Sequence, residues 1–202
     1  MTDSATSDVL STFAEVFTPE ECQTLIALSE SLGYRSALIT EPLDGPYGFA
    51  VRGGRNNSRV AIDDTGLSIA LWRRIAGLVP SNIDGRGAVG LNERLRFYRY
   101  VEGQDFGAHA DGYFKRENGE QSLLTLMIYL NDDYAGGETY FYKSEKLIAP
   151  ETGTILIFTH QLWHAGRVVM DGCKYILRTD IMYEPEISLL CADERIALSN
   201  RS

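Results

Sequence analysis

Cysteine, the residue that forms disulfides and the most common zinc clusters, is scarce in this sequence. The three cysteines, Cys22, Cys173 and Cys191, are odd in number and form no CxxC pair. This pattern predicts neither a zinc knuckle nor a disulfide framework, and we expect all three to be small buried hydrophobic residues. Histidine is equally rare, with three residues in the chain, so a metal site built from imidazoles has few members to choose from.

Long hydrophobic runs and excess positive charge are also missing. No apolar run approaches the ~18 residues that a membrane span needs, and the first residues, MTDSATSDVL, carry no basic region typical of a secretory signal. We therefore expect a cytoplasmic protein with no membrane partner. The formal net charge of −9 argues against a nucleic-acid partner, because phosphate binding needs concentrated Lys and Arg.

What is present fits one soluble domain. The chain has 202 residues, of which 44% are hydrophobic and 23% charged, and it contains no internal repeat or low-complexity linker. We expect a single domain over residues 1–202, with a helical part at about 13–80 and a β-rich core at about 93–183.

The segment FTPEECQTLIALSESLG, residues 17–33, predicts the first helix. Thr18 is a suitable N-cap, Pro19 occupies the first helical position and Glu21 completes a capping box. Gly33 supplies the stop. The expected buried face consists of Cys22, Leu25, Ile26 and Leu32.

A second helix is expected from about Thr65 to Leu78, with Pro80 just beyond its end. Its apolar stripe consists of Leu67, Leu71, Ile75 and Leu78.

From residue 93 onward the hydrophobic period changes toward two, which is typical of strands. Short β-branched and aromatic segments with Gly-rich connections indicate an antiparallel sandwich or barrel, here a jelly-roll-like body with helices packed against it. The expected strands are residues 94–101, 122–130, 138–142, 154–158 and 174–183.

The stretch FGAHADGY, residues 106–113, contains a candidate pair of metal ligands. His109 and Asp111 are two positions apart, so they share one face if the segment is extended. His164, in HQLWHAG after the apolar strand TILIF, is the candidate third ligand, and His160 is the alternative. Two imidazoles and a carboxylate form the facial triad that suits non-haem Fe(II), although the same donors also serve catalytic zinc.

The last expected strand points to an anion. Lys174 and Arg178 share a face with Ile176 and Asp180. A cation directed into a barrel is costly unless it meets an anion, and a dicarboxylate cosubstrate is such an anion. The alternative is an internal pair between Arg178 and Asp180.

Three further residues are candidates for the same pocket. Thr125 and Tyr129 share a face of the segment TLMIYLN, and Tyr129 offers a hydroxyl to a carboxylate. Tyr100 precedes the histidine–aspartate pair closely enough to line the cavity.

Taken together, these residues resemble the prolyl 4-hydroxylase type of catalytic domain within the Fe(II)/2-oxoglutarate-dependent dioxygenases. The matching stretches run from about residue 13 to 183 and occur in the family's order. The motifs HxD, GGET, P-x-x-G and HAG followed by a lysine indicate this family when they occur together, whereas no single one of them does. The stretches are FTPEECQTLI, LRFYRYVEGQDFGAHAD, LTLMIYLNDDYAGGETYFY, IAPETGTILIF and HAGRVVMDGCKYILRTDIMY.

The resemblance implies a double-stranded β-helix (a cupin-like jelly roll) that holds Fe(II) through His109, Asp111 and His164. It implies 2-oxoglutarate bound through its distal carboxylate on Lys174, with Tyr129 as hydroxyl partner. Tyr100 and Thr125 are further cosubstrate-site candidates by their positions. Arg178 is an extra cation that the family pattern does not require, so it competes with Lys174 for that carboxylate.

The implied reaction is hydroxylation of an unactivated C–H bond of a prolyl residue, amino acid or small molecule, using O₂ and releasing succinate and CO₂. Ascorbate is a further candidate cofactor. Family halogenases replace the metal-binding carboxylate with a small residue, and the chain retains Asp111, which favours hydroxylation. The alternatives are a non-catalytic cupin-like module for a small acid or a protein partner and, ranked last, a zinc hydrolase.

The substrate-specifying residues are expected in two polar, Gly-containing loops. One runs from about Ser36 to Asn57 and the other from Gly112 to Gln121. Arg55 and Arg59 are candidates for contact with a carboxylate-bearing substrate, and Tyr113 is a third candidate. The sequence does not specify the substrate, the oligomeric state or the role of the tail CADERIALSNRS.

Overall fold

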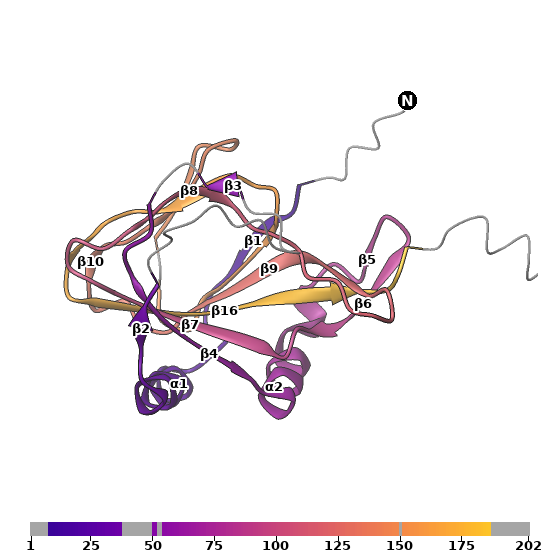
Figure 1. Cartoon of the computed structure of the whole chain (residues 1–202), viewed down its shortest axis with the longest axis horizontal. Coiled ribbons are helices and arrows are strands. Elements are labelled where there is room, and N and C mark those ends of the chain that lie inside the picture. Colours follow the sequence, from indigo (N-terminus) through magenta and orange to yellow (C-terminus); the bar gives the residue numbers. More distant parts are fainter. Residues whose placement is uncertain (1–7, 38–49, 52–53, 150, 187–202) are drawn as a thin grey trace, which may run out of the picture.

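A computed structural model of the chain describes residues 8–37, 50–51, 54–149 and 151–186. The expected mainly β architecture is confirmed: two antiparallel sheets face each other, and two helices cover the outer side of the larger sheet (Figure 1). Cys191, Pro150, the C-terminal tail and much of the loop between Ser36 and Asn57 lie outside the described residues. Neither helix in the described part is long and apolar enough to cross a bilayer.

The larger sheet runs through the middle of the molecule, with β16 beside β9 and β7 at its centre. All the pairs in it are antiparallel, and β6 joins the end of β16. In order, the sheet contains β1 (Leu10–Phe13), β13 (Ile155–Thr159), β9 (Gln121–Tyr129), β16 (Cys173–Tyr183), β7 (Arg94–Val101), β4 (Ser58–Asp63) and β2 (Arg35–Ser36), with β6 (Arg86–Leu91) and β5 (Asn82–Ile83) branching from β16.

The smaller sheet lies across the cavity from β16 and carries both histidines of the expected metal site. Its strands, in order, are β12 (Lys146–Ile148), β11 (Thr139–Phe141), β14 (His164–Gly166), β8 (Phe106–Ala110) and β3 (Ala50–Val51). A separate short pair joins β10 (Ala135–Gly136) to β15 (Val169–Asp171).

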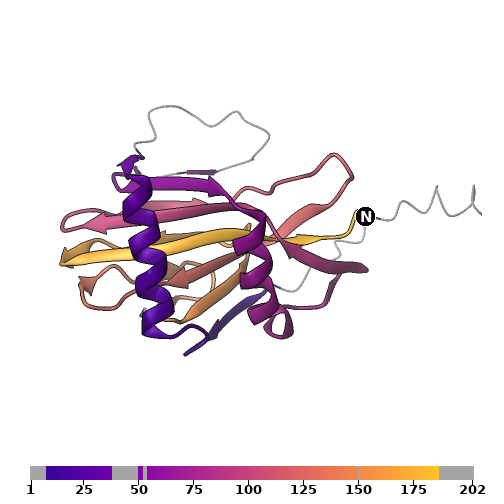
Figure 2. The same ribbon diagram turned by 90° about the horizontal axis from the view of Figure 1, so that it is seen from below.

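Helix α1 (Pro19–Leu32) begins as the sequence predicts. The Thr18 side chain accepts a hydrogen bond from the Glu21 backbone, the Glu21 side chain accepts one from Thr18, and Gly33 ends the helix with φ of 78°. One expected core residue is wrong: Leu32 is 42% exposed, and Ser29 is buried instead. Leu32 lies in the last turn, where the helix has reached the edge of the sheet that it covers (Figure 2).

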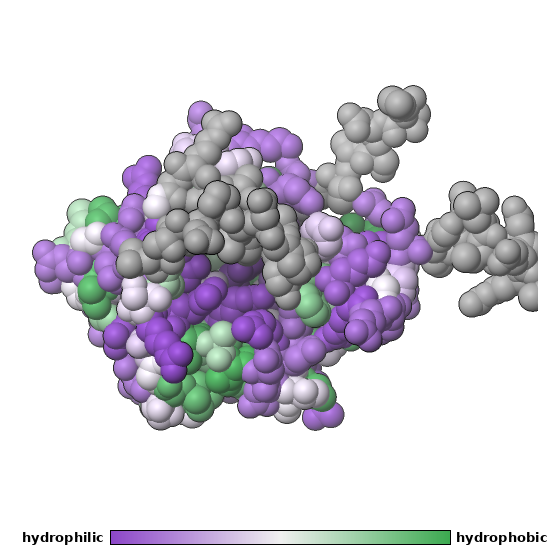
Figure 3. Space-filling model, viewed as in Figure 1, coloured by the Kyte–Doolittle hydropathy of each residue, from purple (hydrophilic) through white to green (hydrophobic). Residues whose placement is uncertain are grey.

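Helix α2 (Thr65–Ile75) also matches its expected segment, with Asp64 as N-cap. Its last expected turn is a separate 3-10 helix, η1 (Ala76–Leu78). Both helices pack on the same face of the larger sheet, so their apolar stripes and that face make the main core (Figure 2). The coloured part of the face drawn in Figure 3 is mostly hydrophilic, with its largest apolar group between the two helices and a smaller one at the β10 end.

Two expectations for the amino-terminal region need correction. It is not purely helical, because β1 and β4 add strands to both flanks of the larger sheet. The stretch from Arg52 to Arg59 is not wholly a loop, since β4 begins at Ser58 and Arg55 forms a bridge with Phe106. Pairing with β7 and β13, far away in the sequence, makes these short segments strands.

A second, smaller core fills the space between the two sheets. It is rich in aromatic residues, and it forms the floor on which the candidate site stands. Its buried members are Tyr98, Tyr100, Tyr129, Phe141, Leu156, Phe158, Leu162, Val169 and Ile176. Of the cysteines, Cys22 is fully buried, as expected, whereas Cys173 is only half-buried.

Candidate active site

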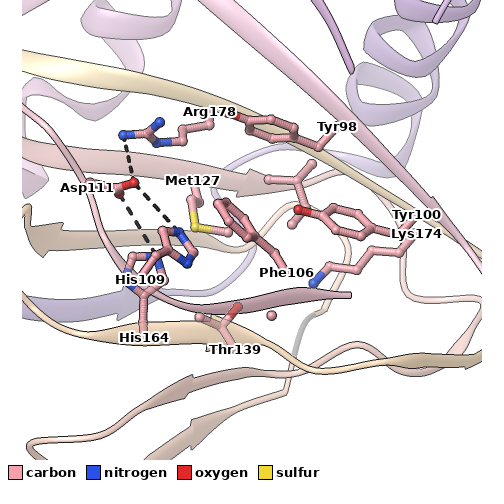
Figure 4. A pocket seen from close by; sticks show the side chains of 12 residues that line it. Tyr98, Tyr100, Phe106, His109, Asp111, Met127, Thr139, His164, Lys174 and Arg178 are labelled. Atoms are coloured by element: carbon pink, nitrogen blue, oxygen red, sulfur yellow. Dashed lines mark ion pairs between the residues drawn. The ribbon is translucent and has the colours of Figure 1, made fainter. Parts of the chain in front are cut away.

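The structure brings His109, Asp111 and His164 together. His164 lies directly opposite His109 in the β14–β8 pair, and Asp111 follows the end of β8. The ligand atoms of the three side chains lie within 4.8 Å of one another. The Nε2 atoms of His109 and His164 are 3.9 and 4.0 Å from the two carboxylate oxygens of Asp111, as the dashed lines in Figure 4 show.

Both imidazoles are fixed in the form that binds metals. His109 Nδ1 lies 2.9 Å from the carbonyl oxygen of Gly107, and His164 Nδ1 lies 2.8 Å from that of Leu162. Because a carbonyl only accepts, the hydrogen must sit on Nδ1 in each ring, which leaves the Nε2 lone pair free. Burial lowers the pKa of His109 to about 3 and also lowers that of His164, so both rings are neutral at pH 7.

Asp111 is held at both of its carboxylate oxygens. Arg178 Nη2 lies 3.0 Å from Oδ1, and the Thr125 hydroxyl donates to Oδ2 at 2.6 Å. Burial on its own raises the pKa of this carboxyl, but the Arg178 guanidinium and the neighbouring imidazoles hold the pKa well below its usual range. Asp111 is therefore an ionised ligand in a fixed orientation.

His160 is not a member of the cluster but supports it from behind. The Thr125 hydroxyl donates its hydrogen to Asp111. The Thr125 oxygen therefore accepts a hydrogen bond from His160 Nδ1, at 2.9 Å. His160 Nε2 then accepts from Ser122 Oγ, also at 2.9 Å. The His160 carbonyl accepts the Asp111 backbone N–H at 2.8 Å. This contact set identifies His160 as a second support for the carboxylate.

The three donors fit a divalent ion such as Fe(II). Two neutral imidazoles and one carboxylate converge from one side, and each is oriented by a partner behind it, as is usual for metal ligands. The opposite side of the cluster faces a small cavity of about 40 Å³, which is lined by aromatic, polar and charged side chains.

Lys174 lies at the far end of this cavity from the three metal-ligand candidates (Figure 4). Its side chain is 2% exposed, and its Nζ donates to the Gly137 carbonyl and lies 5.4 Å from the centre of the Tyr100 ring. No carboxylate of the described residues is within 4 Å of it. Burial lowers the pKa of Lys174 to about 7 against the opposing effect of the Glu138 carboxylate. An anion in direct contact with the ammonium would stabilise its charged form.

Arg178 is engaged at the metal end instead. Besides Asp111, its guanidinium meets Asp180 at 3.4 Å, and Asp180 also accepts from Arg96 at 3.1 Å and from Asn92 at 3.2 Å. The internal pair between Arg178 and Asp180 that was considered as an alternative is thus present. Of the two cations on β16, Lys174 is the one without a carboxylate partner.

The tyrosines divide between the wall and the floor of the cavity. Tyr98 and Tyr100 line it, whereas Tyr129 is not among its lining residues. The Tyr129 hydroxyl is 2.7 Å from Thr139 Oγ1, and Thr139 lines the cavity. Thr125 is likewise outside the lining and contacts Asp111. The complete lining is Tyr98, Tyr100, Phe106, His109, Asp111, Met127, Thr139, His164, Gly166, Lys174, Ile176 and Arg178.

The GGET segment, residues 136–139, places two of the groups at this cavity. Gly136 and Gly137 both have positive φ, and a Cβ on Gly136 would lie 2.4 Å from the Val168 carbonyl oxygen. The turn delivers the Gly137 carbonyl to Lys174 and Thr139 to the cavity. Thr139 was missed as a candidate although its motif was visible, because spacing alone does not show which motif residue faces the site.

The three expected substrate contacts are not together. The Arg55 guanidinium lies over the rings of Tyr98 and Phe106, at 4.8 and 5.0 Å. Arg59 is exposed on β4, opposite Tyr98 in the strand register. Tyr113 is 42% exposed and lines a different cavity, beside Ser122 and His160. Tyr113 is not among the residues that line the metal cavity, so its placement gives no support for a substrate contact there.

Comparison with known proteins supports the same interpretation. Residues 95–179 match the model of the 2OG-Fe(II) oxygenase superfamily. A protein of Acanthamoeba polyphaga mimivirus, named "Putative prolyl 4-hydroxylase", is 32% identical over 103 residues. That match covers 42% of this chain and 42% of the viral protein, so it spans less than half the length of this curated relative.

Solved structures agree on the fold. The viral collagen prolyl hydroxylase of Paramecium Bursaria Chlorella virus-1 in its 2OG complex aligns with a TM-score of 0.60 and 22% identity, covering 86% of this chain and 95% of that one. A Trichoplax adhaerens prolyl hydroxylase in complex with a hypoxia inducible factor peptide fragment aligns with a TM-score of 0.61 and 15% identity, covering 85% and 82%. The double-stranded β-helix is thereby confirmed, and the superfamily implies Fe(II), 2-oxoglutarate and O₂ as its cofactors. The family whose model residues 95–179 match is the one that the sequence resembles.

Proposed function

We propose that the chain is a single-domain Fe(II)- and 2-oxoglutarate-dependent dioxygenase that hydroxylates an unactivated C–H bond, with release of succinate and CO₂. The bound metal supplies the activation of O₂ that no side chain provides. His109, Asp111 and His164 are the proposed ligands. The prolyl hydroxylases of known structure include one with a bound peptide, which favours a prolyl or other peptidyl substrate for this chain, alongside amino acids and small molecules.

Each residue of the cavity then has a defined task. Arg178 and Thr125 orient the Asp111 carboxylate, and the backbone carbonyls behind the histidines keep both Nε2 atoms available. Lys174 binds the distal carboxylate of 2-oxoglutarate. Tyr129, hydrogen-bonded to Thr139, holds that threonine at the cavity wall, so Tyr129 acts on the cosubstrate through Thr139.

The observation that carries the proposal is the pairing of two features in one cavity. A preassembled cluster of two neutral imidazoles and one carboxylate lies at one end. At the other end lies a buried ammonium with no carboxylate of the described residues within 4 Å. A keto-diacid, with a chelating end and a free carboxylate, matches both ends. A zinc hydrolase would not require a buried ammonium such as that of Lys174 opposite the metal.

The test is succinate formation by the purified chain when Fe(II), 2-oxoglutarate and O₂ are supplied, first without and then with a panel of prolyl peptides, amino acids and small molecules. We expect slow succinate formation that requires both Fe(II) and 2-oxoglutarate. His109→Ala should reduce it by at least about 10³-fold, because the metal carries the chemistry. Ascorbate is included and omitted in parallel, which tests its proposed role as a cofactor.

A matched control is His160→Gln, which changes a buried histidine of the same region that is not a metal ligand. It should weaken metal binding far less than His109→Ala does, because it alters a support of Asp111 and removes no ligand. Failure of the folded wild-type chain to bind Mn(II) and 2-oxoglutarate, or to form succinate with any supplement, would leave only the non-catalytic binding module.

A further inference from the structure

A charge imbalance beside the metal cavity remains after the proposed cofactors are placed, and the following inference rests on the proposed function. Arg178 and Arg96 are paired with Asp111 and Asp180. The two negative charges of 2-oxoglutarate offset only the two positive charges of the metal. Glu138 is a further negative charge that acts on Lys174, so Arg55 is the positive charge beside the cavity that no described carboxylate partners.

Arg55 is unusual among the described arginines. Its side chain is 8% exposed, and it forms no ion pair with a described residue. Its Nε is hydrogen-bonded to the Asn57 side chain at 2.6 Å, but its Nη2 is buried and has no hydrogen-bond partner within the described ranges. A buried guanidinium nitrogen without an acceptor destabilises the folded protein, because it has lost its hydrogen bonds to water and gained none in return.

The position of Arg55 ties it to the metal cluster. Phe106 stacks on the His109 ring at 3.6 Å and 15°. Because the imidazole covers one face of Phe106, the Arg55 guanidinium over that ring occupies the other face. The second ring under the guanidinium is Tyr98. Phe106 and Tyr98 both line the metal cavity, so Arg55 stands immediately behind its wall.

A second buried nitrogen without a partner among the described residues lies near Tyr98. Arg178 Nε is also buried and without a hydrogen-bond partner, and Figure 4 shows Arg178 beside the Tyr98 ring. Arg178, Arg55, Arg96 and Arg59, in that order of effect, lower the pKa of Tyr98 against the opposing effect of its burial. The hydroxyl end of Tyr98 is thus in a field of positive charge.

We propose that the prime substrate carries a carboxylate group and that Arg55 binds it between Tyr98 and Phe106, after a shift of these two side chains that opens Arg55 Nη2 to the cavity. The carboxylate would supply the acceptor that Arg55 Nη2 lacks and the negative charge that the site lacks. Substrates without an anionic group at this place, such as internal neutral peptide segments, are disfavoured because they leave the guanidinium unpaired.

Acetate is the probe that tests this site without knowledge of the full substrate. The protein is loaded with Mn(II) and 2-oxoglutarate, and relaxation of the acetate methyl protons is measured as acetate is added. Mn(II) accelerates relaxation only of nuclei close to it, so a saturable enhancement reports a carboxylate bound beside the metal. We expect Arg55→Gln to weaken the apparent acetate affinity by at least about tenfold, the loss of one charge-assisted contact.

The matched control is Arg73→Gln, an exposed arginine in the last turn of α2, which removes the same charge far from the cavity and should leave acetate affinity unchanged. If Arg55→Gln does not fold, Arg55→Lys is used. It should weaken acetate binding by a smaller factor, because it keeps the positive charge but loses the paired N–H donors of the guanidinium. An absence of enhancement, or an equal enhancement in the Arg55 variants, overturns the inference. If the wild-type protein does not bind Mn(II) and 2-oxoglutarate in the loading step, before acetate is added, that result would instead overturn the proposed function.

Discussion

At the metal end of the cavity the charged side chains partner one another, whereas at the opposite end the ammonium of Lys174 meets no carboxylate. Asp111 and Asp180 alternate with Arg178 and Arg96 in one buried chain of ion pairs. Lys174 has a carbonyl and two aromatic rings around it, and its pKa falls to about 7.

The difference indicates how the two ends are prepared for their ligands. The metal end is assembled before the metal arrives, because Arg178 already neutralises the ligand carboxylate. The Lys174 end is left unsatisfied, and a bound carboxylate removes that cost. Changes at the two ends should therefore have opposite effects on the stability of the protein without cofactors.

The largest effect on stability is expected from Arg178→Met. It leaves Asp111 and Asp180 with too little positive charge in a buried site, so the metal-free protein should lose about 3–5 kcal/mol of unfolding free energy. Denaturant titration measures this loss. Metal ions should stabilise the variant more than they stabilise the wild type, because the metal then replaces the missing cation.

Arg178→Lys is the control, since it keeps the charge without the two-pronged geometry, and it should recover part of the loss. An Arg178→Met protein as stable as the wild type would show that the ion-pair chain does not hold Asp111.

Lys174→Met should act in the other direction. Removing an uncompensated buried ammonium should leave the cofactor-free protein equally stable or more stable. The Michaelis constant for 2-oxoglutarate should rise by about 10²-fold, from the loss of roughly 3 kcal/mol of a buried charge pair. Lys174→Arg keeps the charge and should retain more affinity. Unchanged 2-oxoglutarate dependence in Lys174→Met would identify a different anchor.

A smaller effect is expected from Thr125→Val, which removes the hydroxyl that donates to Asp111 while keeping the side-chain shape. Metal affinity should fall by about tenfold, the lower end of the range for residues behind metal ligands. Thr125→Ser retains the hydroxyl and should restore the affinity. Equal weakening by Val and Ser would indicate a packing effect rather than the hydrogen bond.

Local signals in the sequence predicted local structure well. The capping box at Thr18 and Glu21 is read from four adjacent residues and is confirmed. The alternation on β16 also predicted the two faces of that strand, with Lys174 and Arg178 toward the cavity and Leu177 in the main core. Both signals depend only on helix or strand geometry.

Features that depend on register between distant strands were not predictable. The contact of Arg178 with Asp111 requires β16 and β8 to face each other across the cavity. Thr125 reaches Asp111 because β9 pairs with β16 so that Thr125 is opposite Asp180. Residue spacing along one segment contains no information about these pairings, and β4, recognised as a strand only through its pairing with β7, was missed for the same reason.

The most direct measurement is the number of protons taken up when 2-oxoglutarate binds the Mn(II)-loaded protein at pH 8, obtained by calorimetry in two buffers of different ionisation enthalpy. Because the pKa of free Lys174 is about 7 and a bound carboxylate raises it, binding above pH 7 must protonate the lysine. Affinity should then fall by up to about tenfold for each pH unit above 7. We expect close to one proton per 2-oxoglutarate in the wild type and none in Lys174→Met; no uptake in the wild type, or the same uptake in both proteins, would contradict the account.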